Sequence, residues 1–561
     1  MQGLTPIDWG VIALYFVILL VIVWRAARRQ ETSADYFLAG RNIGWFVVGA
    51  SLFASNIGSE HIVGLAGNGA TSGMAMAHWE LHAWIMLMLG WIFVPFYYRS
   101  GVYTMPAFLE KRFNAKTRWV LSCVSLVAYV FTKVSVTVYA GGTVFGVILP
   151  DTFGSPENAF WIGALTTVIL TGLYTVFGGL RAVVFTDALQ AVILLIGSIF
   201  ITFFGLRLLG GWGELVSVVE ANKEQFALWR PLSDPDFPWL GILIASPIVG
   251  IWYWCTDQYI VQRTLAARNL TEARRGTIWG GFLKVWPVFF FLVPGLIGYA
   301  LHQKGLLAIP TETVDGETQI IGDQVFPVMV SSLLPEGLRG LVVGGLLAAL
   351  MSSLSSLFNS CASLFTVDIY EKIRPEATER QLVTTGRIAT GVVVVLGILW
   401  IPIMPLVSEG GLYQYLQSVQ GYLAPPITAV FLLGLFWPRI NAGGAFAGLV
   451  TGFVAGMLKL TCQALVGADI LTAPAILVAF GELNFLYASG WLFALSIGVV
   501  AGVSLATPAQ DRARLAGLTI PTLSATDRRE IRASWNGWDA GLTLGVLALV
   551  IGVYLYFSFW V

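Results

Sequence analysis

The stretch ASNIGSEHIVG, residues 54–64, places hydroxyl, amide, carboxylate and imidazole groups inside an otherwise apolar run. That run covers residues 42–65 and is long enough to cross a bilayer as a helix. Polar and ionisable groups at membrane depth are costly, so they face protein, water or a ligand instead of lipid. The stretch therefore predicts a membrane segment that is interrupted at its middle to form a binding site.

The composition supports the same interpretation for the whole chain. Of its 561 residues, 57% are hydrophobic and 11% are charged, and the mean hydropathy is +0.76. This balance is typical of a polytopic membrane protein. The formal net charge is zero, which gives no electrostatic reason to expect a nucleic-acid partner. No nucleophile–base pair or Cys/His metal spacing indicates an enzyme.

Apolar stretches of about 20 residues recur to the C-terminus and predict an all-α integral membrane protein. We expect 14 transmembrane helices, near residues 7–24, 42–70, 76–98, 119–148, 158–177, 183–210, 238–262, 276–301, 338–366, 386–405, 412–436, 441–463, 485–505 and 537–560. The first has arginines after it and no basic region before it, which indicates an uncleaved helix. An even number places both termini on the same side.

The distribution of basic residues predicts that both termini lie outside. With that orientation, the inner connections carry 24 of the 32 Lys and Arg residues and the outer connections carry four. Cytoplasmic loops are enriched in Lys and Arg, so the imbalance supports the orientation. The single Asn-x-Ser/Thr triplet, at Asn269, falls on an inner loop, and the connection 506–536 is short. Both features favour a bacterial cytoplasmic membrane.

A second interrupted helix is predicted in SPIVGIWYWCTDQ, residues 246–258, where Pro247 and Gly250 break an apolar run. It lies five helices after the first. Interrupted helices at matching positions of two halves are typical of transporters built from inverted repeats. The repeats would cover residues 42–210 and 238–436, preceded by residues 1–41 and followed by three helices in 437–561. The alternative is ordinary kinks, because Gly and Pro are common in membrane helices.

Several longer phrases resemble the sodium/solute symporter family, and within it the sodium/glucose cotransporter branch. They are SLFASNIGSEHIVGLAGNGA, FVPFYYRSGVYTMPAFLEKRF, WYWCTDQYIVQRTLAARN, LMSSLSSLFNSCASLFTVDIY and YLAPPITAVFLLGLFWPR. The similarity runs from about residue 8 to residue 440. It implies a LeuT-type five-plus-five inverted repeat with one leading and three trailing helices.

The resemblance implies a sodium site at the first break. Sodium is a hard cation that prefers several oxygen ligands, and only an unwound membrane helix offers free carbonyls. The residues that match the family's site are Ala54, Ile57 and Ala349 through carbonyls, and Ser352 and Ser353 through hydroxyls. The alternative is that these small residues only permit close helix packing.

The resemblance also implies a sugar site, which needs mixed hydrogen-bond partners and aromatic cover. The matching residues are Asn56, His61, Glu80, Tyr253, Trp254, Lys284, Tyr413 and Gln417. Tyr253 matches the aromatic residue that closes the inward exit. Glu80 and Lys284 have a structural ion pair as their alternative role, and His61 and Gln417 have helix–helix hydrogen bonds.

A second sodium ion is a further expectation from the resemblance. Family members that move two sodium ions have hydroxyls matching Ser355 and Ser356 and an acid matching Asp187. Ser55 completes this set. The alternative roles are a helix N-cap for Asp187 and packing for Ser355.

These expectations together predict a sodium-coupled symporter that imports a glucose- or galactose-like monosaccharide by alternating access. Glu60, His82 and Gly250 depart from the pattern of the animal glucose carriers and leave the identity of the sugar open. The alternatives are a carrier of another polar solute such as inositol, and a sugar-gated sensor or channel.

Overall fold

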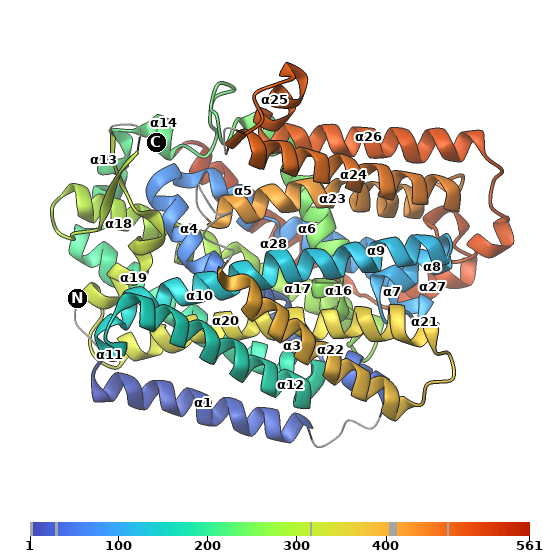
Figure 1. Ribbon diagram of the computed structural model, residues 1–561, viewed down its shortest axis with the longest axis horizontal. Coiled ribbons are helices and arrows are strands. Elements are labelled where there is room, and N and C mark those ends of the chain that lie inside the picture. The colour runs from blue at the N-terminus through green and yellow to red at the C-terminus, as the bar shows by residue number, and fades with distance from the viewer. Residues whose placement is uncertain (1–3, 28–31, 315–316, 403–411, 468–469) are drawn as a thin grey trace.

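Helices account for nearly all of the chain and run side by side along the long axis of the molecule (Figure 1). The computed structural model describes residues 4–27, 32–314, 317–402, 412–467 and 470–561. Within them, 11 helical stretches are long and apolar enough to cross a membrane. The chain is thus a helical, multi-pass membrane protein, and its 14 crossings stay a prediction.

The first half of the chain holds α1 to α12. Their bounds, with the short 3-10 and π-helical turns marked η, are α1 (Pro6–Ala27), α2 (Ser33–Leu38), η1 (Ala39–Arg41), α3 (Trp45–Asn56), α4 (Ser59–Ser72), η2 (Gly73–Met76), α5 (Ala77–Glu80), α6 (Ala83–Met88), η3 (Leu89–Phe93), α7 (Val94–Ser100), α8 (Met105–Arg112), α9 (Ala115–Ala128), η4 (Tyr129–Val134), α10 (Ser135–Ile148), α11 (Pro150–Phe153) and α12 (Pro156–Leu209).

The second half and the trailing helices follow. Their bounds are α13 (Trp212–Glu220), α14 (Lys223–Phe226), α15 (Trp239–Ile251), η5 (Trp252–Thr256), α16 (Gln258–Leu265), α17 (Leu270–Val285), η6 (Val288–Leu292), α18 (Val293–Gln303), α19 (Gly322–Leu333), α20 (Leu338–Ser363), η7 (Leu364–Tyr370), α21 (Glu371–Ile373), α22 (Glu379–Trp400), α23 (Leu412–Phe436), α24 (Ala442–Gly467), α25 (Ala475–Glu482), α26 (Phe485–Ala506), η9 (Arg512–Leu515), η10 (Ile520–Thr522), α27 (Ala525–Ala533) and α28 (Gly537–Ser558). An antiparallel hairpin of β1 (Thr311–Val314) and β2 (Glu317–Ile320) interrupts the all-helical pattern between α18 and α19.

The first predicted helix break is confirmed. Helix α3 ends at Asn56 and α4 begins at Ser59, while Ile57 and Gly58 between them have extended backbones. A helix end leaves backbone carbonyls and N–H groups without their usual partners. The break therefore brings polar backbone groups to the middle of an apolar segment.

The second break lies later than predicted. Pro247 sits inside α15, the chain continues through the π-helical turn η5, and the helix is interrupted only at Asp257. Gly250 is needed for packing instead, because a Cβ there would lie 2.3 Å from the Ile85 side chain. The interruption therefore lies inside the predicted stretch 246–258, but Pro247 and Gly250 were the wrong residues for it.

Helix α12 contains two of the predicted spans. It is 54 residues long and is bent at Gly179, whose φ of 52° lies in the region that favours glycine. A Cβ at this position would also lie 2.7 Å from the Tyr36 carbonyl oxygen. The bend separates the two arms of the helix that the sequence predicts at 158–177 and 183–210.

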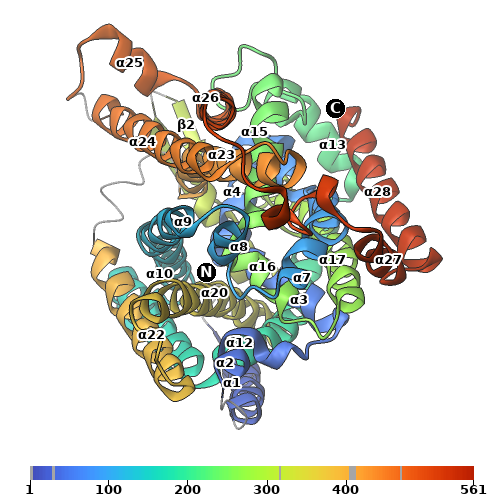
Figure 2. The same ribbon diagram turned by 90° about the vertical axis from the view of Figure 1, so that its right-hand side faces the viewer.

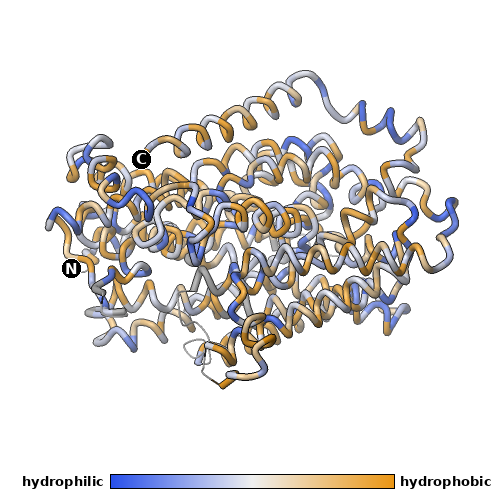
Figure 3. Tube along the Cα trace, turned by 90° about the horizontal axis from the view of Figure 1, so that it is seen from above, coloured by the Kyte–Doolittle hydropathy of each residue, from blue (hydrophilic) through white to orange (hydrophobic). Residues whose placement is uncertain are grey.

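The start of α1 and the C-terminus lie at the same end of the bundle (Figure 1), which fits an even number of crossings. The short helices α8, α21 and α27 lie at the other end, and all three carry basic residues. Hydrophobic residues predominate along the helices, whereas hydrophilic stretches gather mainly near the two ends of the bundle (Figure 3). The side on which the termini lie stays a prediction.

Helix α20 lies in the interior of the bundle. Seen end-on, it is surrounded by other helices, whereas α1, α22 and α28 lie at the periphery (Figure 2). The span that begins with α20 is 89% buried, against 28% for α1 and 22% for α28. The serine-rich turn of α20 is thus shielded from lipid on every side, which allows its hydroxyls to face other polar groups.

Candidate functional site

A cavity lies beside the two helix breaks and collects polar side chains from both halves. Its lining includes seven of the eight residues predicted for the sugar site: Asn56, His61, Glu80, Tyr253, Trp254, Lys284 and Gln417. The remaining lining residues are Trp79, His82, Lys133, Thr137, Val249, Gly250, Tyr259, Leu357, Leu416 and Gln420. The side chain of the eighth, Tyr413, lies outside the described part of the structure.

Glu80 is the centre of a buried charge cluster on this cavity. Its carboxylate lies 2.6 Å from the Lys284 ammonium and 3.3 Å from Nε2 of His61. Glu80 and Lys284 are almost fully buried. A carboxylate accepts and an ammonium only donates, so together they offer both kinds of partner that a hydroxyl needs. The Glu80–Lys284 ion pair, which is the structural alternative to a role in sugar binding, is therefore present at the wall of the cavity.

Apart from the atoms of the Glu80–His61 pair, three buried polar atoms on cavity-lining residues have no hydrogen-bond partner among the described residues. They are Oδ1 of Asn56, Oε1 of Gln417 and Nε1 of Trp79, and all three are buried. Buried polar groups in native proteins are nearly always paired with protein, water or a ligand. A polyhydroxylated ligand in the cavity would supply partners for two acceptors and one donor on its lining residues.

Aromatic rings form the part of the wall next to the second break. Tyr253 and Trp254 meet edge to face with centroids 5.0 Å apart. The ammonium of Lys133 lies within 4.7–5.2 Å of four ring centroids, including those of Tyr253 and Tyr259. It also donates to Asp257, the residue at the break, over 2.6 Å. Sequence reasoning missed Lys133, although an ionisable residue within a predicted membrane span was the available signal.

The residues predicted for the first sodium site lie where α3 meets α20. A hydrogen bond links the two helices there, since the hydroxyl oxygens of Ser55 and Ser356 are 3.2 Å apart. Ser353 has a buried hydroxyl without a partner among the described residues. Ser352 donates to Asp187 over 2.6 Å, which leaves the lone pairs of its oxygen available to a cation.

The carbonyls at the first break differ in their partners. The Ala54 carbonyl accepts the backbone N–H of Ile57 over 3.2 Å. The Ser55 carbonyl, which was not in the predicted set, accepts the hydroxyl of Tyr259 from α16. This contact connects the first broken helix to the second.

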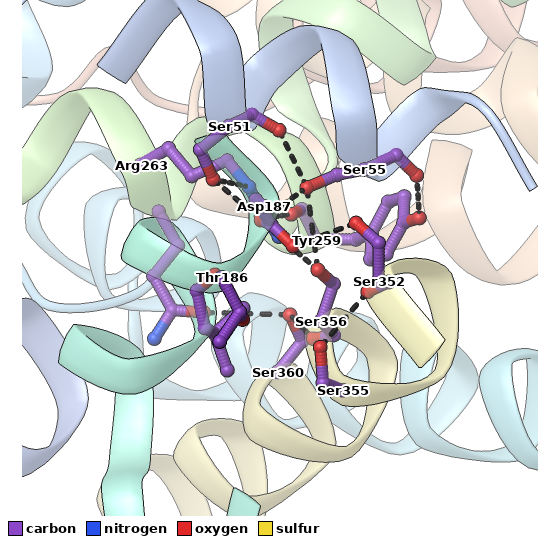
Figure 4. Close-up of polar contacts among 12 residues, drawn as sticks. Ser51, Ser55, Thr186, Asp187, Tyr259, Arg263, Ser352, Ser355, Ser356 and Ser360 are labelled. Carbon is purple, nitrogen blue, oxygen red and sulfur yellow. Dashed lines mark hydrogen bonds and ion pairs between the residues drawn. The ribbon is translucent and has the colours of Figure 1, made fainter. Parts of the chain in front are cut away.

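Asp187 lies at the centre of the second predicted cation site (Figure 4). Its carboxylate accepts hydrogen bonds from Ser51 at 2.6 Å, Ser55 at 3.0 Å and Ser352 at 2.6 Å. The N-cap alternative for Asp187 is wrong, because α12 departs from helical geometry only at Gly179, two turns earlier, and Asp187 is fully buried. Its carboxylate is thus positioned by the helix interior and faces α3 and α20.

The other residues predicted for this second site differ in their hydrogen-bond partners. Ser356 contacts Ser55, whereas Ser355 donates to the Ser352 carbonyl over 3.0 Å. Two residues were missed: Ser51, one turn before Ser55, and Arg263, whose guanidinium lies 3.5 Å from the Asp187 carboxylate. A lone arginine in a predicted inner region gave no sequence signal that it would enter the core.

Comparison with known proteins gives consistent matches. The model of the sodium:solute symporter family matches residues 36–452. The chain is 38% identical to sodium/glucose cotransporter 4 of Danio rerio, over 94% of this chain and 83% of that protein. It is also 38% identical to the sodium/myo-inositol cotransporter of Homo sapiens, over 89% of this chain and 73% of that protein.

A solved structure has a similar fold. It is the substrate-bound, outward-open state of a Na+-coupled sialic acid symporter, with a TM-score of 0.74 and 21% identity. The match covers 90% of this chain and 99% of that one. At this identity the likeness concerns the fold alone, which is the LeuT-like arrangement expected above.

Proposed function

Because the chain belongs to the sodium:solute symporter family and is a sodium-coupled solute carrier, not an enzyme, we propose that it imports a monosaccharide of the glucose or galactose type. The observation that carries the proposal is the cavity at the two breaks. There the Glu80–Lys284 pair, with a separation of 2.6 Å, stands near the unpartnered amide oxygens of Asn56 and Gln417. Tyr253 and Trp254 provide the aromatic surface that covers a sugar ring.

The electrostatics of the cavity favour a neutral, hydroxylated solute. Lys284 already has a carboxylate partner in Glu80, so a carboxylate substrate would have to compete with Glu80 for the same ammonium. A buried charge without its partner is strongly disfavoured. Hydroxyl groups donate to amide and carboxylate oxygens and accept from an ammonium, and they add no charge.

Inositol is the second candidate substrate. A myo-inositol cotransporter is as similar to the chain as a glucose cotransporter is, with 38% identity in both cases. Both solutes present a ring of hydroxyls, so the described cavity supports either one. The sugar is preferred because an aromatic pair at one wall suits the apolar face of a pyranose ring.

The proposal places one sodium ion among Ala54, Ile57, Ala349, Ser352 and Ser353. The unpartnered hydroxyl of Ser353 supports it, and the main-chain break supplies the oxygen atoms that a hard cation prefers. A second sodium ion is proposed at Asp187 with Ser55, Ser355 and Ser356. Ser352 donates to Asp187 over 2.6 Å, so a ligand of the first ion is hydrogen-bonded to a ligand of the second.

Alternating access would follow from the movement of one repeat, residues 42–210, against the other, residues 238–436. Sodium at the first break would stabilise the conformation that binds solute, and solute would in turn raise sodium affinity by the same factor. The contact of Tyr259 with the Ser55 carbonyl supports such a linkage, because it ties the two broken helices together. Residence in a bacterial cytoplasmic membrane remains part of the proposal.

The test is uptake by proteoliposomes that contain the purified chain. Radiolabelled glucose, galactose, myo-inositol and sialic acid are offered with an inward gradient of sodium or of potassium. We expect uptake of a monosaccharide with sodium only. Uptake of myo-inositol in preference to both sugars would select the second candidate. Sodium currents evoked by sugar without accumulation would indicate a sugar-gated channel instead, and sodium-independent uptake would contradict both proposals.

A further inference from the structure

Arg263 shares the polar cluster of Asp187 with the serines. Both residues are fully buried in the interior of the bundle. The guanidinium lies 3.5 Å from the Asp187 carboxylate, its Nε donates to the Ser51 hydroxyl over 3.0 Å, and its Nη2 donates to the Ser356 hydroxyl. Figure 4 shows the side chain entering the cluster from α16, on the side opposite to α20.

These hydrogen bonds use the oxygen lone pairs that a metal ion would need. A guanidinium only donates hydrogen bonds, so each hydroxyl that it contacts must act as an acceptor. Ser356 belongs to the shell proposed for the second sodium ion, and its oxygen accepts from Arg263. While Arg263 holds this position, the Ser356 oxygen is engaged by a cationic group that belongs to the protein itself.

The charge balance leads to the same conclusion. The Asp187 carboxylate and the Arg263 guanidinium cancel each other in a buried region. A sodium ion that joined them would leave one uncompensated positive charge in an environment of low polarity, which is strongly disfavoured. Sodium in place of the guanidinium keeps Asp187 neutralised, and it replaces hydrogen-bond donors by one hard cation that the serine oxygens can ligate.

We propose that Arg263 is a tethered competitor of the second sodium ion, and that it must withdraw from Asp187 before sodium binds there. The inference rests on the second sodium site of the proposed function and adds the residue that sets the affinity of that site. Because the competitor is attached to the chain, its effective concentration is fixed by the structure and not by the solution.

The position of Arg263 links this exchange to the substrate cavity. Its helix, α16, starts directly after the second break at Asp257, and Tyr259 of the same helix lines the cavity. Arg263 also donates to the backbone carbonyl of Tyr259, and the Tyr259 hydroxyl donates to the Ser55 carbonyl at the first break. Withdrawal of Arg263 would therefore disturb contacts at both breaks, through which the second sodium ion would act on the sugar.

The experiment measures binding of radioactive sodium to the purified full-length chain, with choline chloride keeping the ionic strength constant. Arg263→Gln removes the charge, and Arg263→Lys keeps it on a side chain that cannot reproduce the forked geometry. Asp187→Asn removes the carboxylate, and Asp187→Asn combined with Arg263→Gln keeps the cluster neutral. Ser331→Ala is the matched control, because this buried serine of α19 bonds within its own helix and to no other element among the described residues.

We expect Arg263→Gln to bind the second sodium ion at least about fivefold more tightly, the lower end of usual coupling factors, with a smaller gain for Arg263→Lys. Asp187→Asn and the double variant should lose that ion and keep the other. If Asp187→Asn loses an ion but neither Arg263 variant binds sodium more tightly, the competition is refuted and the second site stands. If Arg263→Gln cannot be purified folded, an unchanged affinity in Arg263→Lys refutes the competition. If Asp187→Asn keeps both the number of ions and their affinity, the second site and the competition are refuted together.

Discussion

The side-chain amide of Asn56 donates a hydrogen bond of 3.1 Å to the hydroxyl of Tyr253. Asn56 is the last residue of α3, and Tyr253 lies in η5 shortly before the second break. The bond therefore joins the two interrupted helices beside the cavity that both residues line. Any movement that opens this side of the cavity has to break the bond or carry both helices together.

Tyr253 is expected to govern release of the solute more than its recognition. Tyr253→Phe removes the hydroxyl that Asn56 contacts but keeps the ring next to Trp254, and Tyr253→Ala removes both. A neutral hydrogen bond contributes about 1 kcal/mol, so Tyr253→Phe should change equilibrium sugar affinity by only a few-fold. Tyr253→Ala should lose coupled uptake while it still binds sugar.

The measurement for Tyr253 compares equilibrium sugar binding in detergent with uptake in proteoliposomes. Tyr139→Phe serves as the control, because Tyr139 packs against Phe160 and does not line the cavity. Abolished sugar binding in Tyr253→Phe would move Tyr253 into the recognition set.

We expect the Glu80–Lys284 pair to stabilise the fold and to bind the solute. A double variant separates these two roles. Glu80→Gln leaves Lys284 buried without its carboxylate, which costs about 3–5 kcal/mol of stability in typical buried pairs. Glu80→Gln combined with Lys284→Met removes both charges and should recover most of that stability. A hydrogen bond to a charged group contributes about 1.5–3 kcal/mol, so both variants should bind sugar at least about tenfold more weakly.

Thermal unfolding and sugar binding are measured on the same preparations of these two variants. Normal sugar affinity in the double variant would show that the pair has only a structural role. Weak sugar binding together with restored stability would assign both residues to the solute.

Ser353 is the sharpest test of the first sodium site, because its hydroxyl has no other described partner that the substitution would disturb. Ser353→Ala should lower the apparent sodium affinity of uptake, and potassium should not replace sodium in either protein. If Ser353 only permits close packing, alanine would be tolerated without any change in sodium dependence. The sodium concentration that gives half-maximal uptake is the readout, with Ser331→Ala as the control.

The helices and the first break could be predicted from the sequence because both depend on local properties. A run of apolar residues long enough to span a bilayer forms a helix, and polar residues in its middle mark a site. The second break was misplaced for a local reason as well. Pro247 stays inside α15, and the turn that ends the helix is set by Asp257, whose side chain accepts the backbone N–H of Tyr259.

The partners of the buried charges could not be predicted, since they depend on which helices meet. Lys133 and Asp257 are far apart in sequence, as are Asp187 and Arg263, and no local pattern links them. Asp187 was placed near a helix start because the sequence does not reveal that α12 continues through Gly179. The cavity residues were predicted from the resemblance to a known family, because their positions in the sequence do not show that they lie together.

Asp8 is expected to anchor the leading helix to α20. Its carboxylate accepts the backbone N–H groups of Gly337 and Gly340 over 2.7 and 2.8 Å, at the start of α20. Asp8→Ala would leave these donors unpaired, at a cost of about 1–3 kcal/mol for the buried Gly340 N–H and less for the half-buried Gly337 N–H. Asp8→Asn keeps one acceptor oxygen and should be milder. Thermal unfolding should show this order of stabilities, while sodium affinity per folded molecule stays unchanged; equal stability of all three proteins would contradict the anchor.

The number of sodium ions per sugar is the last expectation, and it depends on Asp187. The carboxylate is fully buried and collects hydrogen bonds from three serine hydroxyls on two helices, Ser51, Ser55 and Ser352. A carboxylate with hydroxyls around it is a shell that suits a hard cation. We therefore expect two sodium ions per sugar, and one after Asp187→Asn.

The reversal potential of reconstituted transport measures this ratio, because it depends on the sodium gradient in proportion to the number of ions moved. Ser352 belongs to the first proposed site and donates to Asp187 of the second, so Ser352→Ala should weaken sodium binding at the first site and disturb the carboxylate of the second. Ser353→Ala should affect the first site and leave the Asp187 cluster intact. A ratio near one in the unmodified protein, unaltered by Asp187→Asn, would mean that Asp187 neutralises Arg263 and holds α3 against α20 without binding a second ion.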